Sequence, residues 1–498
     1  MIYAVDLSKP TAEIIERPVS RTFGMTDMYR DFKNARNEHY LEEELSKLES
    51  RAGETVSKMR KYFEEGKTEV WITRSERNTL RKFLFIMKYR SSRMHKRFYH
   101  ENAQGYSEND KEKLFRYMDE KGFKKPVDVW FDNIKGMLEL KMDVKDDWIR
   151  DFPTRIYPGD AMWFIAHTQM MYLALCTPAN KDDEFLLTEN AYGIYEGPSS
   201  VVKDPITGET IMTPYTEFHK FAVISPKLMM ILRNFILPVA EEDLNEEVKS
   251  FRDTMFKLNA NQHSRPSAVV STLADLPITK PRNSYTKIVN GRVVLLDGRD
   301  GSRRVDDRFC FRFFPLMTEH INKINAIMLE ESYRISNIVF KSHTGLRKAI
   351  DYYLTMPTVR GYKLCSGMPD DPRFLLLKKL EQLVNEMGSD VTAVYRTHSQ
   401  VQQNQEQFIE EQEDIFAQIL EENLPKEPSV TMQLYTKLGR FISVQQEDVV
   451  LYGIYRRKSE DLPKRYGTSS PNAQHANKDR RLHTRSQRRL PRRRPRKH

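Results

Sequence analysis

The stretch Glu184-Phe-Leu-Leu-Thr-Glu-Asn-Ala-Tyr-Gly-Ile-Tyr195 marks the point where this 498-residue sequence changes from helical to extended patterning. Two short runs, Glu184–Thr188 and Ala191–Tyr195, lie on either side of Glu189-Asn190. Apolar runs bounded by turn residues are typical of strands. Because helical patterns surround this region, we predict an α+β fold that is dominated by helices and has a small central antiparallel sheet.

The residues before this stretch follow helical periodicity. One apolar stripe at steps of three and four consists of Leu41, Leu45, Leu48, Ala52, Val56, Met59 and Phe63. The pattern Thr73-x-x-Glu76 is a capping box and predicts the start of another helix. Residues 161–176 are strongly apolar but fewer than the ~20 residues that span a bilayer, so we predict a buried core helix there.

The residues after it alternate between strand and helix patterns. Phe218 to Ile224 reads as a strand, and Ser225-Pro226 reads as the N-cap and first residue of a helix. Two β-rich runs joined by Asn290-Gly291 predict a hairpin over residues 285–296. A strand is predicted at 308–313, and helices are predicted at 316–333, 346–354, 374–387 and 401–422.

Charge is unevenly distributed along the chain, whose formal net charge is +10 at pH 7. Residues 456–498 hold 16 of the 80 Lys and Arg but only 3 of the 70 Asp and Glu, so residues 1–455 are nearly neutral. We predict an α+β domain over 1–355, in which 261–283 reads as a loop or linker. A helical extension over 373–455 and a disordered Arg-rich tail over 456–498 complete the predicted layout.

Cysteine usage and the N-terminal residues indicate the compartment. The three cysteines, Cys176, Cys310 and Cys365, are far apart and odd in number, which suits a reducing environment and does not suggest a zinc site. The first residues lack the basic and apolar regions of a secretory signal. We therefore expect an intracellular protein, cytoplasmic or nuclear, that is not secreted and not inserted in a membrane.

A family resemblance starts at the same stretch. Residues 185–198 and the following Ile224-Ser-Pro-Lys-Leu-Met-Met-Ile-Leu-Arg233 resemble fungal members of the domain of unknown function 4238 family. Further similar segments are Leu48-Glu-Ser50, Thr73-Arg-Ser-Glu-Arg77, residues 80–90, Asp128-Val-Trp130 and residues 324–331. Family members usually begin with a His-Tyr-x-Pro segment that this sequence lacks, so we expect a misplaced start or a shortened member. The resemblance implies a fold but no reaction and no cofactor.

Nine Lys and Arg side chains lie between Arg74 and Arg97, against one acid, Glu76. One interpretation is a phosphate-binding helix face, since guanidinium pairs well with phosphate oxygens. The other is internal pairing with the Glu-rich preceding helix (Glu38, Glu42, Glu43, Glu44 and Glu49), which we favour because charge runs are usually solvated or paired. The anion-binding candidates are Arg74, Arg77, Arg81, Arg90, Arg93 and Arg233.

Candidate catalytic residues are Glu189, Asn190 and His219, and Glu196 could join them in an acid–base or metal-binding set. Turn chemistry alone explains Glu189-Asn190, and we favour it over a site; Ser225 reads as a helix cap and not a nucleophile. His167 reads as a hydrogen-bonded core residue. No motif of the sequence predicts a metal site, and none names a cofactor.

Two function classes remain open. A noncatalytic protein would engage nucleic acid through the tail, where Arg488, Arg489, Arg492, Arg493 and Arg494 also fit a nuclear-import signal, with help from the basic helix. The alternative is a hydrolase or nuclease-like enzyme near Glu189-Asn190, to which Arg74 and Glu76 could contribute. We favour the first, since it needs no unseen geometry. The tail has no selected role if it results from a misread exon boundary, and the oligomeric state is left open.

Overall fold

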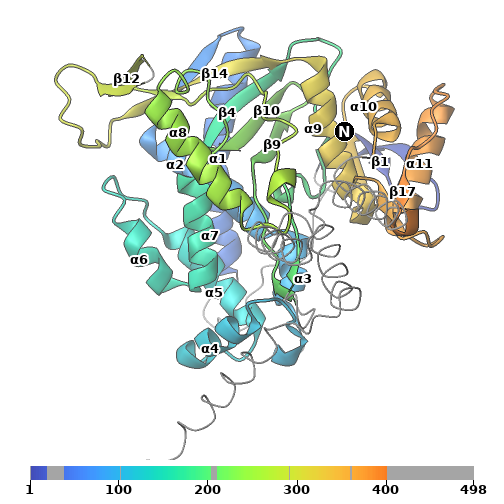
Figure 1. Cartoon of the computed structure of the whole chain (residues 1–498), viewed down its shortest axis with the longest axis horizontal. Helices are drawn as coiled ribbons and strands as arrows, with labels where there is room; N and C mark the ends of the chain where they lie inside the picture. The colour runs from blue at the N-terminus through green and yellow to red at the C-terminus, as the bar shows by residue number, and fades with distance from the viewer. Residues whose placement is uncertain are drawn as a thin grey trace, which may run out of the picture. The chain divides into compact units, whose positions relative to one another are not determined.

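The computed structural model of the chain describes residues 2–19, 39–100, 102–203, 210–290, 292–358 and 362–400. The chain divides into a compact unit, Met1–Thr397, and a second unit that is almost entirely outside the described residues. The predicted helix at 401–422 and the Arg-rich tail therefore lie outside them. Helices and strands both contribute substantially to the described chain, so the predicted α+β class is confirmed (Figure 1).

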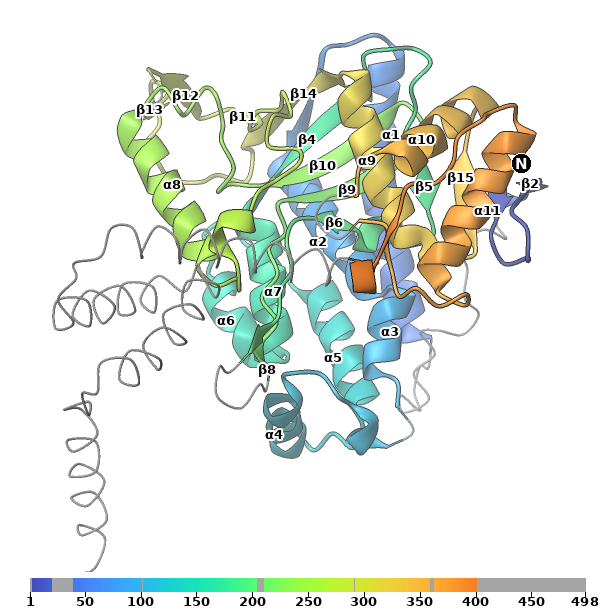
Figure 2. The ribbon, with the colours of Figure 1, turned by 45° about the vertical axis from the view of Figure 1, so that its right-hand side comes forward.

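The N-terminal half of the unit is helical and has its own core. Its helices are α1 (Tyr40–Glu64), α2 (Arg74–Tyr89), α3 (Ser92–Phe98), α4 (Lys111–Lys121), α5 (Pro126–Glu139), α6 (Trp148–Arg155) and α7 (Pro158–Gln169), with a 3₁₀ turn at Ala103–Gly105. Large apolar side chains of these helices, such as Phe85, Trp130 and Phe164, are fully buried together. Figure 2 shows α4 to α7 gathered on one side of the main sheet.

The main sheet is seven-stranded and mixed. Its strands are β3 (Glu69–Thr73), β4 (Met171–Pro178), β6 (Tyr195–Glu196), β9 (His219–Ser225), β10 (Leu228–Asn234), β11 (Arg282–Asn283) and β14 (Arg308–Leu316). The order is β11-β14-β4-β10-β9-β6, and β3 also pairs with β14. Neighbours are antiparallel except β14 and β4, which run parallel from Phe313 opposite Leu175.

Both faces of this sheet are covered by helices. Leu173, Leu175, Met230 and Leu232 on one face pack with apolar residues of α1 and α2. Their neighbours in sequence point to the other face, because side chains alternate along a strand. There Ala174, Cys176, Met229 and Ile231 pack with α9 (Thr318–Glu330). The central strands are therefore apolar on both faces.

A smaller sheet has the order β2-β1-β15-β5 and supports the last helices of the unit. Its strands are β1 (Ile2–Asp6), β2 (Glu13–Arg17), β5 (Leu187–Thr188) and β15 (Asn337–Phe340), and its helices are α10 (His343–Thr355) and α11 (Pro372–Glu386). Val5, Ile338, Leu346 and Leu380 lie in one buried cluster. The helix predicted at 374–387 thus packs into the same core as the N-terminal strands.

The remaining elements are peripheral. Helix α8 (Glu246–Ala260) lies beside the predicted hairpin, which is present as β12 (Thr286–Val289) and β13 (Arg292–Leu295) with Asn290 at φ 50° (Figure 2). Short pairs are β7 (Val202–Lys203) with β8 (Thr210–Met212) and β16 (Leu364–Cys365) with β17 (Arg396–Thr397). Further 3₁₀ turns are Ala191–Gly193, Pro266–Ala268 and Glu331–Arg334.

Three sequence predictions are corrected. The apolar helix predicted over 161–176 ends at Gln169, and β4 begins at Met171. The helix predicted from Ser225 is strand β10, and Pro226 lies in the turn between β9 and β10. A strand buried on both faces reads as a continuous apolar run, which periodicity cannot distinguish from a core helix. The strands also form several sheets, so the sheet is not a single small central antiparallel one.

Candidate functional site

The start of α2 is held in place by its cap and by a strand. Thr73 Oγ1 accepts a hydrogen bond from Glu76 N at 3.2 Å, and Glu76 Oε2 accepts one from Thr73 N at 2.6 Å. This is the predicted capping box, and it satisfies helix N–H groups that would otherwise lack partners. Because β3 pairs with β14, the first turn of α2 meets the loop before β14, and Arg74 N donates to Asp307 O at 3.0 Å.

A cavity of about 380 Å³ lies between α1, the start of α2 and the chain that follows α5. We call it the cationic cavity. Its lining consists of Glu44, Leu48, Arg51, Arg74, Ser75, Asn78, Thr79, Lys82, Leu138, Leu140, Lys141, Met142, Val144 and Val305. Four of these side chains are cationic and one is a carboxylate. The volume is within the range of small-molecule sites.

Lys82 carries the more enclosed of the two ammonium groups in this lining. Its Nζ donates to the carbonyl oxygens of Leu138 and Leu140, at 3.0 Å and 2.5 Å. Burial, with a further contribution from the charge of Arg51, lowers the pKa of Lys82 to about 8. Arg51 itself is exposed, and no acidic side chain within the described ranges forms an ion pair with it. An anion in the cavity would meet two cations, Arg51 and Lys82, that no carboxylate of the described residues neutralises.

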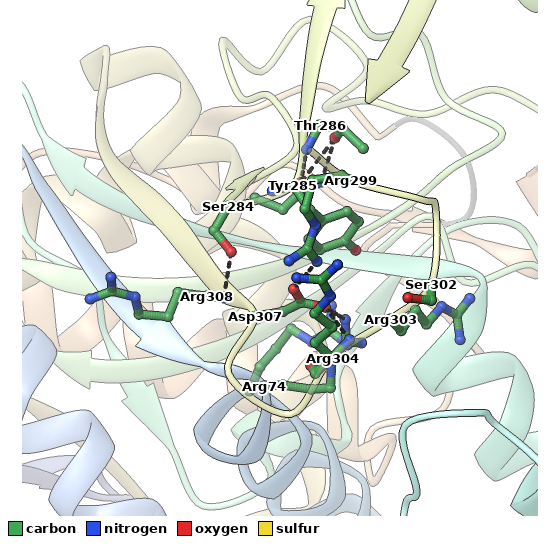
Figure 3. Close-up of polar contacts among 12 residues, drawn as sticks. Arg74, Ser284, Tyr285, Thr286, Arg299, Ser302, Arg303, Arg304, Asp307 and Arg308 are labelled. Carbon is green, nitrogen blue, oxygen red and sulfur yellow. Dashed lines mark hydrogen bonds and ion pairs between the residues drawn. The ribbon is translucent and has the colours of Figure 1, made fainter. Parts of the chain in front are cut away.

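Arg74 borders the cavity but is neutralised internally. Its Nη2 lies 2.5 Å from Asp307 Oδ2, its Nε donates to Arg304 O at 3.1 Å, and Arg299 binds the other oxygen of Asp307. Figure 3 shows Arg74 and Arg299 converging on this one carboxylate. Asp307 has no exposed side-chain surface, so the cluster fixes the loop to α2.

Arg77 and Arg81 lie on the adjoining face of α2. The Arg77 guanidinium carbon is 3.8 Å from the centre of the Phe309 ring, and its Nε is buried without a hydrogen-bond partner. Both side chains are partly buried. Burial, followed by the charges of neighbouring arginines, lowers the pKa of Arg77 and of Arg81. In the part of the chain that the structure describes, neither arginine has an acidic partner.

Other cations of the basic run have acidic partners. Arg90 lies 2.6 Å from Glu49 of the preceding helix, and Arg97 lies 2.9 Å from Asp110. Lys88 binds Glu217, which also binds Lys220 at 2.5 Å. The side chain of Arg93 is not among those described. Among the described side chains, the run therefore contains paired cations, the exposed Lys96 of α3, and a group without acidic partners on α2.

His219 and Arg233 lie elsewhere, in a buried polar network on β6, β9 and β10. His219 Nδ1 is 2.9 Å from Glu196 Oε2, which also accepts from Ser271 Oγ at 2.9 Å. Glu196 Oε1 accepts from Thr272 N at 2.7 Å. We call these five residues the closed network, because Glu196, His219 and Arg233 are 3%, 0% and 1% exposed.

Arg233 determines the hydrogen-bonding state of this network. Its Nη1 lies 3.2 Å from His219 Nε2, and its other bonds go to the carbonyl oxygens of Pro238, Leu273 and Ala274. Since arginine only donates, His219 Nε2 accepts and Nδ1–H donates to Glu196. Burial lowers the pKa of His219 against the opposing effect of Glu196. The ring is thus neutral, and both its nitrogens are occupied.

Glu189 and Asn190 contact a different part of the unit. Glu189 Oε2 accepts from Ser336 N and Oγ, at 2.9 Å and 2.8 Å, and Asn190 Nδ2 donates to Glu331 O at 2.9 Å. They follow β5 of the smaller sheet, whereas His219 begins β9 of the main sheet. Of the candidate acids, Glu196 and not Glu189 contacts His219.

Two cations of the cationic cavity were not among the residues predicted from the sequence. Arg51 precedes buried Ala52 on α1, and Lys141 follows buried Leu140 after α5. Both lie at the margin of an apolar surface, where a long charged side chain can reach a neighbouring helix. Such a position is a weak signal, because many surface helices have one. Within the described ranges, no group of His, Cys, Asp or Glu side chains could hold a metal ion, and no helix combines the length and apolarity needed to cross a membrane.

Comparison with known proteins gives one relation. The model of a family described as "Protein of unknown function (DUF4238)" matches residues 1–344, about two thirds of the chain. No curated protein and no solved structure matches the chain. The matched residues include the cationic cavity, the closed network and the strands of both larger sheets. The chain therefore belongs to the DUF4238 family of proteins of unknown function.

Proposed function

We propose that the folded unit binds a phosphate-bearing ligand in the cationic cavity and holds it without covalent chemistry. The observation that carries this proposal is the charge of the lining, in which three cations besides the internally paired Arg74 face one carboxylate, Glu44. Ammonium and guanidinium groups bind phosphate oxygens through charge-assisted hydrogen bonds. Ser75, Asn78 and Thr79 add neutral polar groups to the same wall.

The lining also favours binding over reaction. Its carboxylate, Glu44, is bound to Lys47 at 2.6 Å and is not held against a nucleophile. The rest of the wall is apolar and includes Leu48, Leu138 and Val144. An apolar wall beside a cationic one suits an organic phosphate, whose carbon part packs while its phosphate pairs.

Nucleic-acid binding through the Arg-rich tail stays a separate prediction from the sequence. Its arginines, Arg488 to Arg494, lie outside the described residues. The basic helix gives limited support, because Lys88, Arg90 and Arg97 already pair with acids of the chain. A hydrolase site at Glu189, Asn190 and His219 also stays a prediction, and no contact in the structure joins its acid to its histidine.

The test is phosphate binding by the full-length protein. Calorimetric titration with inorganic phosphate should give a Kd at or below about 1 mM. The variant Arg51→Gln should weaken binding about tenfold, since a charge-assisted bond contributes on the order of 1.5–3 kcal/mol. Arg51 is exposed and has no acidic partner among the described residues, so the melting temperature of the variant should equal that of the wild type.

The matched control is Lys378→Gln on α11. Lys378 is also exposed, and its ion pair with Glu381 belongs to the other end of the unit. This variant removes the same charge and should leave phosphate affinity unchanged. Equal affinity of the two variants, or no saturable binding by the wild type, would show that the cavity is not a phosphate site.

A further inference from the structure

Arg77 and Arg81 are the unexplained charges of this region. They lie next to the cationic cavity but do not line it, and the described chain gives them no carboxylate. Arg74, one turn away, shows what the fold does with a structural arginine, because Asp307 holds it at 2.5 Å. All three arginines belong to helix α2, and they differ in whether an acidic side chain pairs with them.

Leaving these two charges unpaired lowers stability. A partly buried cation loses hydration, and here the neighbouring arginines repel it as well. Stacking on Phe309 recovers part of this cost for Arg77, and it also fixes the guanidinium plane. The buried Nε of Arg77 remains without a partner. Such a group is stabilised when an anion binds.

The position of the pair relative to the cavity follows from helix geometry. Successive residues of an α-helix turn by about 100°. Arg74, Asn78 and Lys82 therefore share the face toward the cavity, while Arg77 and Arg81 share the next face, with Arg74 at the boundary. One ligand can reach both faces around Arg74 if it carries two linked anionic groups.

Further cations extend the second face. The charges of Arg74 and Arg303 both lower the pKa of Arg77 and of Arg81, which places Arg303 near them. Arg303 pairs with Asp146, and Figure 3 shows it on the loop that carries Arg299 and Arg304. The Tyr285 ring also lies beside this group, with its centre 5.9 Å from the Arg74 guanidinium carbon. The surroundings are cationic, as a second phosphate site requires.

We propose that the ligand of this domain carries at least two linked phosphate groups, one in the cationic cavity and one bound by Arg77 and Arg81. The inference rests on the proposed phosphate-binding function and adds the ligand class, a small di- or polyphosphorylated molecule. Arg77 and Arg81 act as specificity-determining residues that distinguish such a ligand from a monophosphate.

The test compares inorganic pyrophosphate with inorganic phosphate on the full-length protein. Wild type should bind pyrophosphate at least about tenfold more tightly, as expected for one or two added charge-assisted bonds. The double variant Arg77→Gln/Arg81→Gln should remove most of that preference and keep the affinity for phosphate. Its melting temperature without ligand should stay equal or rise, because two uncompensated charges are gone.

Four outcomes separate the possibilities. Equal affinity for phosphate and pyrophosphate would overturn the inference and leave the proposed function intact, whereas absence of binding to both would remove the proposed function too. A lower melting temperature of the ligand-free double variant would show a structural role for the pair. Tight binding of a single-stranded DNA oligonucleotide, with weak binding of pyrophosphate, would replace the small-molecule class by nucleic acid.

Discussion

The closed network and the cationic cavity are both rich in polar groups, but they differ in whether acidic and basic side chains pair with one another. In the closed network, Glu196, His219 and Arg233 bind each other and nearby backbone groups, and all three are at most 3% exposed. In the cavity, Lys82 donates only to backbone carbonyl oxygens and Arg51 is exposed, and neither has a carboxylate partner among the described residues. Sequence alone presented His219 and Arg233 as site candidates equal to Arg74. The structure shows that the balance of charge, and not polarity itself, distinguishes a scaffold from a candidate site.

The largest effect on stability is expected from a substitution that disrupts the closed network. Glu196→Ala leaves the His219 Nδ1–H and the Thr272 N–H buried without an acceptor. Each buried donor left without an acceptor typically costs about 1–3 kcal/mol, so the free energy of unfolding in urea should fall by about 2–6 kcal/mol. Arg51→Gln, at the cavity, should change it by less than about 0.5 kcal/mol. A loss below about 1 kcal/mol for Glu196→Ala would mean that the network is not structural.

The sequence predicted those parts of the fold that depend on neighbouring residues, and not those that depend on tertiary packing. Local signals worked: the capping box at Thr73 and the Asn290 turn each depend on a few adjacent residues. The strands β4 and β10 were misread as helices, because only the tertiary position reveals that both faces of a strand are buried. Helices α1, α2 and α9 are far apart in the sequence, so local patterns do not predict which helices cover each face of the sheet.

The candidate site was predictable to a similar degree. Arg74, Arg77 and Arg81 stand out as a basic helix face, and all three lie at or beside the cavity. The three arginines differ in their partners, however. Arg74 pairs with Asp307, which lies 233 positions further along the chain. Charge pairing over such a separation depends on strand β14 pairing with β3. Which cation is unpaired is therefore a tertiary property.

The second prediction sharpens the comparison from the cavity side. Lys82 has a pKa of about 8, because it is buried near Arg51, so it is cationic below that pH and neutral above it. Affinity for sulfate, an anion whose own charge stays constant, should be level below pH 8. It should then fall by up to about tenfold per pH unit. Calorimetric titration between pH 7 and 9.5 measures this change.

Lys82→Arg is the matched variant, because arginine keeps its charge over this range. Its sulfate affinity should not depend on pH. The ligand-free wild type should show the reverse trend in stability. A pKa that is lower in the folded state than in the unfolded state, near 10.4, means that stability increases as pH rises from about 8. Anion affinity that stays constant in the wild type would show that Lys82 does not contact the ligand.

The smallest expected effect concerns acid sensitivity of the closed network. The pKa of His219 is lower in the folded protein than its ordinary value, chiefly because of burial. The unfolded chain therefore takes up a proton first as pH falls through about 6.5, and stability decreases from there downward. One imidazole limits the slope to about 1.4 kcal/mol per pH unit. His219→Asn can keep an N–H donor toward Glu196 without titrating, so urea midpoints between pH 7 and 5 should fall less for this variant than for wild type. Parallel curves for the two proteins would mean that other groups cause the acid sensitivity. Protonation of the closed network would then not affect stability in this pH range.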